Sequence, residues 1–505
     1  MSFLNDLKET INEDFNESVT ENGAIGYRTT GKYLLDMNFL VSSMRGMEED
    51  EIVNMFSKTF YENKLLAIKW LFYAADVRGG LGERRLFRIC FKYLASEHEK
   101  IAKCLLNLIP EYTRWDNLIV LLEDKLLVND IIYIIKNQLT EDIYNMKNNK
   151  PVSLLAKWMP SINTSSNKTK KLARIIINEM RFSKALYRKT LSSLRKYLKI
   201  VEVSMCAKEW GSIDYSAVPS RANLFYNNAF LRNDKERREL YLDSLQKGET
   251  KINASVLFPH DIVSKYSSKY DITLEELWKS LPDFVNGNGK TICVADGSGS
   301  MCRKIPNTKI SCLDVANSLA IYFSERCSGE FKDNYITFSN RPQLVDLSNA
   351  NSLKEKIVIA KKYCEISDTN IQAVFTLILG TAINKNLKQE DIPDNILILS
   401  DMEFNSCTEV GCYDERINKR LFQYISDSYK LYGYKLPRII FWNIYSRSKT
   451  IPIKENELGV TLVSGFSPNI VKMVLSNKLD PFECLLEQLN SERYYPIEKA
   501  IIDKI

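Results

Sequence analysis

Hydrophobic and polar positions follow two different patterns in the two halves of the chain. From about Tyr27 to Leu245, apolar residues recur every three or four positions, which is the spacing of helices that bury one face. The stretches Leu65–Tyr73 and Leu172–Leu198 show this spacing, and Pro and Gly residues separate them from their neighbours. The first half therefore predicts several helices joined by short turns, a helical-repeat-like stack without a clean sequence period.

From about Lys290, short apolar runs replace the helical period. Thr291–Ala295 is continuous and apolar, as expected of a strand that is buried on both faces. A helical stretch from Ile310 to Cys327 follows it, and another is expected from about Ile371 to Ile383. We expect further strands at Tyr335–Phe338, Ile396–Leu399, Arg438–Trp442 and Val460–Val463. Alternating strands and helices of this kind predict a parallel, doubly wound sheet.

The two patterns together predict a multidomain fold, an all-α domain followed by an α/β domain. We expect a tail over residues 1–25, the helical domain over 26–250 and a linker over 251–289. The α/β domain would take residues 290–478, and a C-terminal helical segment residues 479–505. The run Asn286–Gly289 is expected to act as a hinge or turn in the linker.

Composition narrows the class of protein. Of the 505 residues, 45% are hydrophobic and 26% are charged, which is typical of a globular chain rather than a disordered or fibrous one. No apolar run reaches the roughly 18 residues of a membrane span, and Met1–Asp6 shows no secretory signal, so we expect no membrane association. The 11 cysteines form no CxxC pair, which predicts reduced thiols in the cytosol or nucleus, and we expect a cytoplasmic protein. With only two histidines, chemistry that needs several imidazoles is nearly excluded.

Positive charge is concentrated in one segment of the helical half. The whole chain carries a formal charge of +6, yet residues 151–230 contain 14 Lys and Arg against 4 Asp and Glu. Five cations in this segment are spaced so that one continuous helix would carry them on a single face: Arg181, Lys184, Arg188, Arg195 and Lys199. The apolar residues Tyr187, Leu191, Leu194 and Leu198 would form a second stripe that packs inward. Such a face favours binding of a nucleic-acid backbone, although a solvated helix surface produces the same pattern.

A cluster of oxygen-bearing side chains follows the first strand of the α/β half. Asp296, Ser298 and Ser300 come directly after that strand, Thr369 lies in a later loop, and Asp401 follows the strand Ile396–Leu399. Ligands of doubly wound sheets bind beyond the carboxyl ends of the strands, and an all-oxygen set suits Mg²⁺ or Mn²⁺. The simpler alternative is that Asp296 and Ser300 only cap the next helix.

This arrangement resembles the metal-ion-dependent adhesion site of von Willebrand factor A (VWA) domains. In that family a DxSxS motif, a loop threonine and a strand-terminal aspartate hold a divalent cation. The resemblance implies that Ser298, Ser300 and Thr369 ligate the ion through their hydroxyl groups, and that Asp296 and Asp401 bind it directly or through water. It also implies a partner that bears a carboxylate, which would complete the coordination of the ion.

Two enzymatic motifs are incomplete. Gly289–Thr291 resembles the end of a phosphate-binding P-loop, but it precedes a strand instead of following one, and Phe284 occupies the required glycine position. No GxSxG motif is present, and neither histidine has the context of a catalytic triad. A metal-dependent phosphodiesterase would need more carboxylates than Asp296 and Asp401. We therefore expect a protein that is not an enzyme.

The helical half contains motifs that resemble a family of domains of unknown function, numbered 2828, which pairs such a region with a VWA-like domain. The motifs are Asp76–Arg85, Ile109–Asp116, Ser153–Ser161 and Ile213–Ser220. The layout is more distantly similar to the Ro autoantigen, whose helical TROVE domain binds small noncoding RNA and misfolded RNA ends. Within the first motif, Gly79–Gly82 favours a tight turn between helices, and a phosphate-binding loop is the alternative.

The sequence thus predicts a non-enzymatic, Ro-like protein that binds small noncoding or misfolded RNA through its helical domain. Its VWA-like domain would hold Mg²⁺ or Mn²⁺. The alternative is a protein-interaction scaffold or chaperone adaptor that acts through the metal site without nucleic acid.

Overall fold

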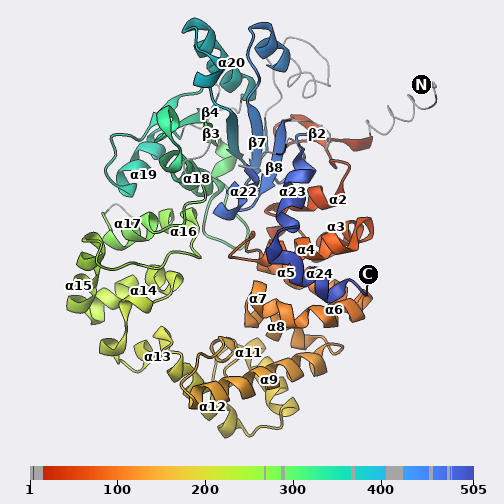
Figure 1. Ribbon diagram of the computed structural model, residues 1–505, viewed down its shortest axis with the longest axis vertical. Coiled ribbons are helices and arrows are strands. Elements are labelled where there is room, and N and C mark those ends of the chain that lie inside the picture. Colours follow the sequence, from red (N-terminus) through yellow and green to blue (C-terminus); the bar gives the residue numbers. More distant parts are fainter. Residues whose placement is uncertain are drawn as a thin grey trace. The chain divides into compact units, whose positions relative to one another are not determined.

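The computed structural model divides the chain into two compact units (Figure 1). Each unit is built from two segments: Met1–Glu62 with Leu257–Ser491, and Asn63–Val256 with Glu492–Ile505. The structure describes residues 4, 15–266, 269–285, 290–339, 341–364, 370–404, 425–453, 459–474, 478 and 480–504. The predicted hinge Asn286–Gly289 lies outside these residues.

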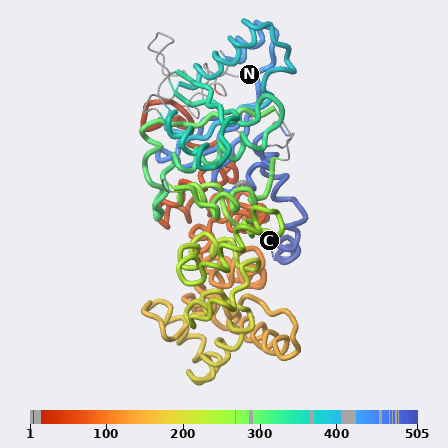
Figure 2. The backbone as a smooth tube through the Cα atoms, turned by 90° about the vertical axis from the view of Figure 1, so that its left-hand side faces the viewer, coloured from red at the N-terminus to blue at the C-terminus, as the bar shows by residue number. Residues whose placement is uncertain are grey.

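The second of these units, the helical unit, contains helices throughout, as the sequence predicts. Its helices between residues 64 and 246 can be followed one after another along the orange, yellow and light green part of the tube in Figure 2. They are α4 (Lys64–Ala75), α5 (Arg84–Glu97), α6 (Glu99–Leu105), α7 (Ile109–Tyr112), α8 (Trp115–Val120), α9 (Val128–Lys147), α10 (Leu155–Trp158), α11 (Asn167–Glu179), α12 (Lys184–Tyr197), α13 (Val201–Cys206), α14 (Ser220–Asn233), α15 (Lys235–Gln246) and α24 (Tyr495–Ile501).

The C-terminal helix α24 belongs to the helical unit, although almost the whole chain separates it from α4. It packs against α4 and α6, which lie beside it in Figure 1. All residues of α4 from Ala67 to Ala75 are buried, and its Lys69 reaches Glu498 of α24 at 2.7 Å. Asn63 caps α4 by accepting a hydrogen bond from the Leu66 N–H at 3.0 Å. The predicted C-terminal segment over residues 479–505 is therefore shared between the two units.

The first unit, the α/β unit, is organised around a six-stranded sheet. The strands are β3 (Thr291–Asp296), β4 (Asn334–Phe338), β5 (Leu344–Asp346), β6 (Asn395–Ser400), β7 (Arg438–Asn443) and β8 (Val460–Ser464). Their order is β5-β4-β3-β6-β7-β8, and all neighbours are parallel except β4 and β5. The five long strands coincide with the predicted ones, and the predicted fold class is confirmed. The sequence does not reveal β5, because it has three residues and buries only the middle one.

Helices complete the α/β unit. They are α2 (Tyr33–Phe39), α3 (Glu49–Glu62), α16 (Pro259–Val263), α17 (Ile272–Lys279), α18 (Cys312–Arg326), α19 (Leu353–Lys362), α20 (Ile371–Asn384), α22 (Val471–Val474) and α23 (Pro481–Leu489). Helix α18 packs on β3, β4 and β6, and α20 packs on β4. Within the described part of the chain, every helix is too short or too polar to span a bilayer.

Three segments that precede the predicted α/β domain belong to this unit. One of them holds α2 and α3, so the predicted start of the helical domain at residue 26 is wrong, and the helical unit begins at Asn63. The hairpin of β1 (Glu17–Val19) and β2 (Ile25–Tyr27) joins it through a bridge between Tyr27 and Ile451. The predicted linker contributes α16 and α17, and Trp278 of α17 is buried and donates a hydrogen bond to Glu325 at 2.7 Å. Hydrophobic periodicity identifies helices but does not tell which unit buries their apolar faces. The sequence therefore placed α2 and α3 in the helical domain and α16 and α17 in a linker, and it did not reveal the short hairpin.

Candidate functional site

Asp296 and Asp401 stand at the carboxyl ends of two neighbouring strands. Asp296 is the last residue of β3, and Asp401 directly follows β6, which pairs with β3 in parallel. The chain runs from β3 to β4 on one side and places β6 on the other, so the strand order reverses here, which is where doubly wound sheets bind ligands. Both carboxyl groups are buried.

Hydroxyl groups surround the Asp296 carboxylate. It accepts hydrogen bonds from the Ser298 N–H at 2.9 Å and from the Ser400 hydroxyl at 2.6 Å. The hydroxyl groups of Ser298 and Ser300 lie 3.0 Å apart, and the Ser300 side chain lowers the pKa of Asp401. The structure therefore brings together Asp296, Ser298, Ser300 and Asp401, four of the five predicted ligands. The fifth, Thr369, lies outside the described residues.

The alternative that Asp296 and Ser300 merely cap the following helix is wrong. Ser298 precedes a short 3-10 turn, Gly299–Cys302, which contains Ser300 and has no side-chain cap. The next α-helix, α18, begins only at Cys312. Its cap is Ser311, whose hydroxyl accepts a hydrogen bond from the Asp314 N–H at 3.1 Å.

An arginine that the sequence analysis did not select neutralises part of this site. The Arg447 guanidinium donates a hydrogen bond to the Asp401 carboxylate at 2.9 Å and another to Glu21 of the β1–β2 hairpin, also at 2.9 Å. The Arg447 side chain is only 12% exposed. Its position could have been inferred, because Arg447 follows β7, and β7 ends at the same sheet edge as β3 and β6.

Glu403 fixes the loop that carries Arg447. Its buried carboxylate accepts hydrogen bonds from the backbone N–H groups of Arg447 at 2.6 Å and Ser448 at 2.9 Å. The other carboxylate oxygen accepts the Glu21 N–H at 2.8 Å. One acidic side chain thus holds both Arg447 and its second partner in place.

Burial and like charge shift the titration of the two aspartates. Burial, with the neighbouring charge of Asp401, raises the pKa of Asp296 to about 7. Burial also raises the pKa of Asp401, although the charge and hydrogen bond of Arg447 counteract part of that effect. Burial by itself would lower the pKa of Arg447, but Glu21 and Asp401 raise it, so Arg447 stays positively charged.

The donor chemistry of this site fits a divalent cation. Two carboxylates and two hydroxyls converge, and oxygen donors of this kind are the ligands that Mg²⁺ and Mn²⁺ prefer. Within the described residues, no group of three or more His, Cys, Asp or Glu side chains is arranged to hold a metal. A cation at Asp401 would therefore depend on hydroxyl groups, and it would share or replace the carboxylate contact that Arg447 makes.

The predicted basic face does not lie on one helix. The chain turns between α11 and α12, and Arg181 has a positive φ of 54° in that turn. Lys199 follows the end of α12 with a φ of 49°. Of the five predicted cations, only Lys184, Arg188 and Arg195 lie on α12. The prediction that all five share one helical face is therefore wrong. The spacing of the cations indicates one face because the turn between α11 and α12 has only a few residues. The apolar residues therefore keep almost the same period across the turn.

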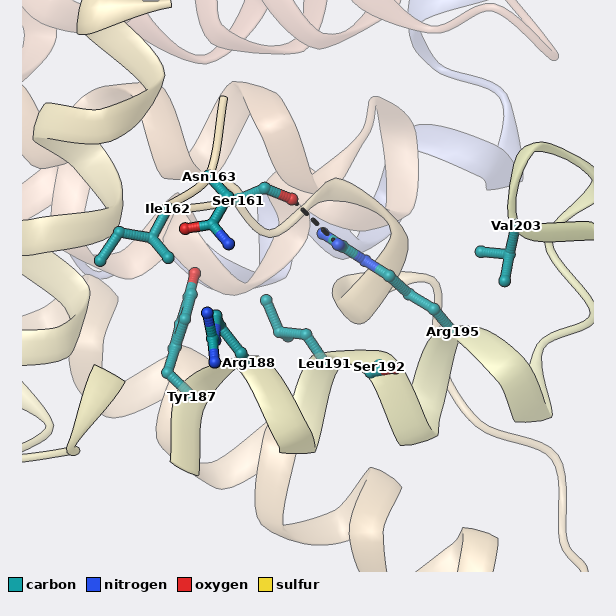
Figure 3. Close-up of a pocket in the computed structure, with 9 residues that line it drawn as sticks. All are labelled: Ser161, Ile162, Asn163, Tyr187, Arg188, Leu191, Ser192, Arg195 and Val203. Carbon is teal, nitrogen blue, oxygen red and sulfur yellow. Dashed lines mark hydrogen bonds between the residues drawn. The ribbon is translucent and has the colours of Figure 1, made fainter. Parts of the chain in front are cut away.

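Arg195 is a structural residue of the helical unit. Its guanidinium donates hydrogen bonds to the carbonyl oxygens of Ala156 at 2.9 Å and Met159 at 2.7 Å, and to the Ser161 hydroxyl at 3.0 Å. Figure 3 shows this side chain extending along a pocket of about 290 Å³ toward Ser161, with Arg188 near the other end. Burial lowers the pKa of Arg195. The N–H groups of Arg195 therefore mainly hold the segment Ala156–Ser161 against α12.

Lys184 and Arg188, by contrast, do not hold other segments in place, although Arg188 also lines the pocket in Figure 3. Both are exposed, and neither forms an ion pair within the part of the chain that the structure describes. The apolar stripe of the same helix behaves as predicted, since Tyr187, Leu191 and Leu194 are buried. Helix α12 therefore packs through one face and presents two unpaired cations on another.

The glycine cluster forms a tight turn, which was the favoured reading of the sequence. Gly82 has a φ of 76°, which residues with a side chain rarely adopt. A Cβ atom at Gly80 would lie 1.9 Å from the Tyr73 carbonyl oxygen, so no larger residue fits there. Nearby, the Arg493 guanidinium pairs with the buried Asp76 carboxylate.

The fold defines a protein with a helical unit and a VWA-like α/β unit. Residues 178–288 match a domain of unknown function, DUF2828, which confirms the resemblance seen in the sequence, and residues 290–496 match another, DUF7788. An uncharacterized protein of Acanthamoeba polyphaga mimivirus is 29% identical over 523 residues, covering 95% of this chain and 89% of the relative. The crystal structure of the Deinococcus radiodurans Ro (RSR) protein matches 83% of this chain and 89% of its own, with 11% identity and a TM-score of 0.36.

Proposed function

We propose that this protein is a non-enzymatic, cytoplasmic RNA-binding protein whose helical unit holds an RNA backbone. The observation that carries the proposal is the surface of α12, where Lys184 and Arg188 are exposed and unpaired among the described residues. Both lie in the segment 151–230, which carries ten more cationic than acidic side chains. Unpaired cations on a rigid helix bind phosphates without reading bases.

The test compares two variants with the same change in charge. Lys184→Gln/Arg188→Gln removes two exposed cations of α12, and Lys247→Gln/Lys251→Gln removes two exposed lysines elsewhere in the helical unit. The α12 variant should weaken binding of two unrelated RNA sequences by similar factors, because backbone contacts carry no sequence information. The control variant should bind both RNAs like the wild type. If both variants lost RNA affinity equally, binding would depend only on net charge, and the α12 surface would have no specific role.

The α/β unit is proposed to hold Mg²⁺ or Mn²⁺ at Asp296, Ser298, Ser300, Thr369 and Asp401. The support is the convergence of the four described oxygen donors at the edge where the strand order reverses. The ion would supply a positive centre for a carboxylate of a partner protein. Asp296→Ala and Asp401→Ala should each abolish Mn²⁺ binding in calorimetry, and Ser300→Ala should weaken it. Unchanged affinity in both aspartate variants would exclude the site.

Arg447 should oppose the cation at this site. Arg447→Gln removes a positive charge that contacts Asp401, so the variant should bind Mn²⁺ about tenfold more tightly than the wild type, or ~1.4 kcal/mol. Arg303→Gln is the matched control, because Arg303 also contacts Glu21 but, among the described residues, forms no ion pair with Asp401 and is largely exposed. The second candidate function, a protein-interaction scaffold without nucleic acid, would keep this metal behaviour and show no effect of the α12 variant.

A further inference from the structure

The pocket beside α12 is formed by three segments of the helical unit (Figure 3). One wall consists of α12, the segment Ser161–Asn163 lies across from it, and Val203 of α13 lies near one end. Its volume of about 290 Å³ is close to the lower limit of small-molecule sites, roughly 300 Å³. The pocket therefore has room for a single small ring system but not for a helix or strand of a partner.

Hydrogen bonds hold the walls of this pocket in place before a ligand binds. The buried Tyr187 side chain donates one from its hydroxyl group to the Pro160 carbonyl oxygen at 2.7 Å. Arg195 donates others to the Met159 carbonyl oxygen at 2.7 Å and to the Ser161 hydroxyl at 3.0 Å. These contacts hold one wall of the pocket against α12. Because the pocket is already formed, a ligand loses less free energy to ordering when it binds.

The lining combines apolar walls with a few exposed polar groups. The aliphatic residues of the lining are Ile162, Leu191 and Val203. Three further lining side chains are exposed and form no hydrogen bond or ion pair within the described part of the chain: Asn163, Arg188 and Ser192. Small-molecule sites typically have this composition, in which apolar surface provides contact area and a few polar groups orient the ligand.

We propose that this pocket binds one unpaired base of an RNA strand while Arg188 contacts the adjoining phosphate. The inference rests on the proposed function, because Arg188 is one of the two cations that would hold the RNA backbone. It adds that the bound RNA is single-stranded at this point, since a base that is paired with another strand could not enter the pocket.

The lining residues favour a base over other small ligands. Arg188 belongs both to the pocket and to the exposed surface of α12, so a phosphate on its guanidinium would lie beside the pocket. The Asn163 amide offers donors and an acceptor, as the polar edge of a base does. The aliphatic side chains would shield the faces of the base from water. A purely apolar ligand would use neither Asn163 nor Arg188.

The first test compares two RNA strands that have the same backbone charge. One is an oligouridylate, and the other is an abasic strand of the same length. Fluorescence anisotropy measures the affinity of the full chain for each strand. The wild type should bind the oligouridylate about tenfold more tightly, which is the effect expected of one well-packed base. Equal affinities for the two strands would overturn the base site.

Ser192→Leu fills part of the pocket without changing the charge of the protein. Ser193→Leu is the matched control, because Ser193 is exposed on the same helix but does not line the pocket. Ser192→Leu should lose most of the tenfold preference for the oligouridylate and bind the abasic strand like the wild type. Ser193→Leu should bind both strands like the wild type. Equal effects of the two substitutions on oligouridylate binding would overturn the site.

Asn163→Ala tests recognition of the polar edge of the base without filling the pocket. It should weaken oligouridylate binding several-fold, because the amide hydrogen bonds are lost, and leave binding of the abasic strand unchanged. Wild-type affinity for the oligouridylate in Asn163→Ala would overturn this recognition.

Base pairing provides a further comparison. When the oligouridylate is annealed to its complement, its bases cannot enter the pocket, so the wild type and Ser192→Leu should bind the duplex equally. A loss of duplex affinity in Ser192→Leu would overturn the base site, because the substitution would then act on the surface of α12.

The base site and the proposed function fail in different measurements. The base site fails if the wild type binds the oligouridylate and the abasic strand equally. The proposed function fails if Lys184→Gln/Arg188→Gln binds the abasic strand like the wild type, because that strand offers only a backbone.

Discussion

The two charge clusters of this protein differ in how their charge is balanced. In the α/β unit, the buried aspartates at the sheet edge are accompanied by Arg447, which the chain itself supplies and Glu403 holds in place. In the helical unit, Lys184 and Arg188 of α12 are exposed and form no ion pair among the described residues. A charge cluster that the chain itself neutralises is stable without a ligand. A cluster that keeps excess charge favours binding of a ligand with the opposite charge.

Removing Arg447 should have the largest effect on stability. Arg447→Ala leaves Asp401 buried and unpaired beside Asp296, and breaking a buried pair in this way typically costs about 3 kcal/mol. Urea unfolding should show this loss, and saturating Mn²⁺ should restore part of it by supplying a replacement charge. Arg303→Ala, which removes an exposed arginine near the same glutamate, should change the unfolding free energy little. A fully stable Arg447→Ala protein would mean that the acid pair does not need its own counter-charge.

Replacing Arg195 should have the next largest effect on stability. The comparison distinguishes a cation that holds the fold together from the exposed cations of the same helix. Arg195→Gln loses charged hydrogen bonds to two carbonyl oxygens, so we expect a loss of about 2 kcal/mol in the unfolding free energy. Lys184→Gln on the same helix should stay within about 0.5 kcal/mol of the wild type. Comparable stability of both variants would show that Arg195 is as dispensable as its exposed neighbours.

Asp116 should give a smaller effect on stability. Asp116→Asn removes the carboxylate that Arg88 and Arg114 share, and because all three side chains are partly exposed, we expect a loss of only about 1 kcal/mol in the unfolding free energy. Urea unfolding measures this quantity. Stability equal to that of the wild type would show that these ion pairs do not stabilise the helical unit.

Local patterns predicted the α/β unit better than the helical surface. The strands Thr291–Asp296 and Asn395–Ser400 are continuous apolar runs, so they and the aspartates after them could be located from the sequence. The failure at Arg181 and Lys199 has a different cause. Both residues adopt a left-handed backbone conformation at a helix end, which interrupts a spacing that the sequence seems to continue. Periodicity reports the distance along the chain, not the point at which a helix ends.

The sequence also could not predict which residues pair with the charged side chains. Arg447 and Glu21 are more than 400 positions apart, yet a hydrogen bond of 2.9 Å joins them. Arg195 looked equivalent to Arg188 in spacing, but only Arg195 meets the carbonyl oxygens of Ala156 and Met159. Such contacts depend on tertiary packing, so an arginine that anchors the fold and one that faces solvent have the same signature in a sequence.

The salt dependence of RNA binding tests most directly whether the helical unit binds a polyanion through its outward-facing charge. Each phosphate contact contributes about 0.7–0.9 to the slope of log affinity against log salt concentration. Lys184→Gln/Arg188→Gln should therefore flatten the slope by about 1.4–1.8 relative to the wild type, while Lys247→Gln/Lys251→Gln leaves it unchanged. A wild-type slope and affinity in the α12 variant would contradict the claim and show that this face is only a solvated surface.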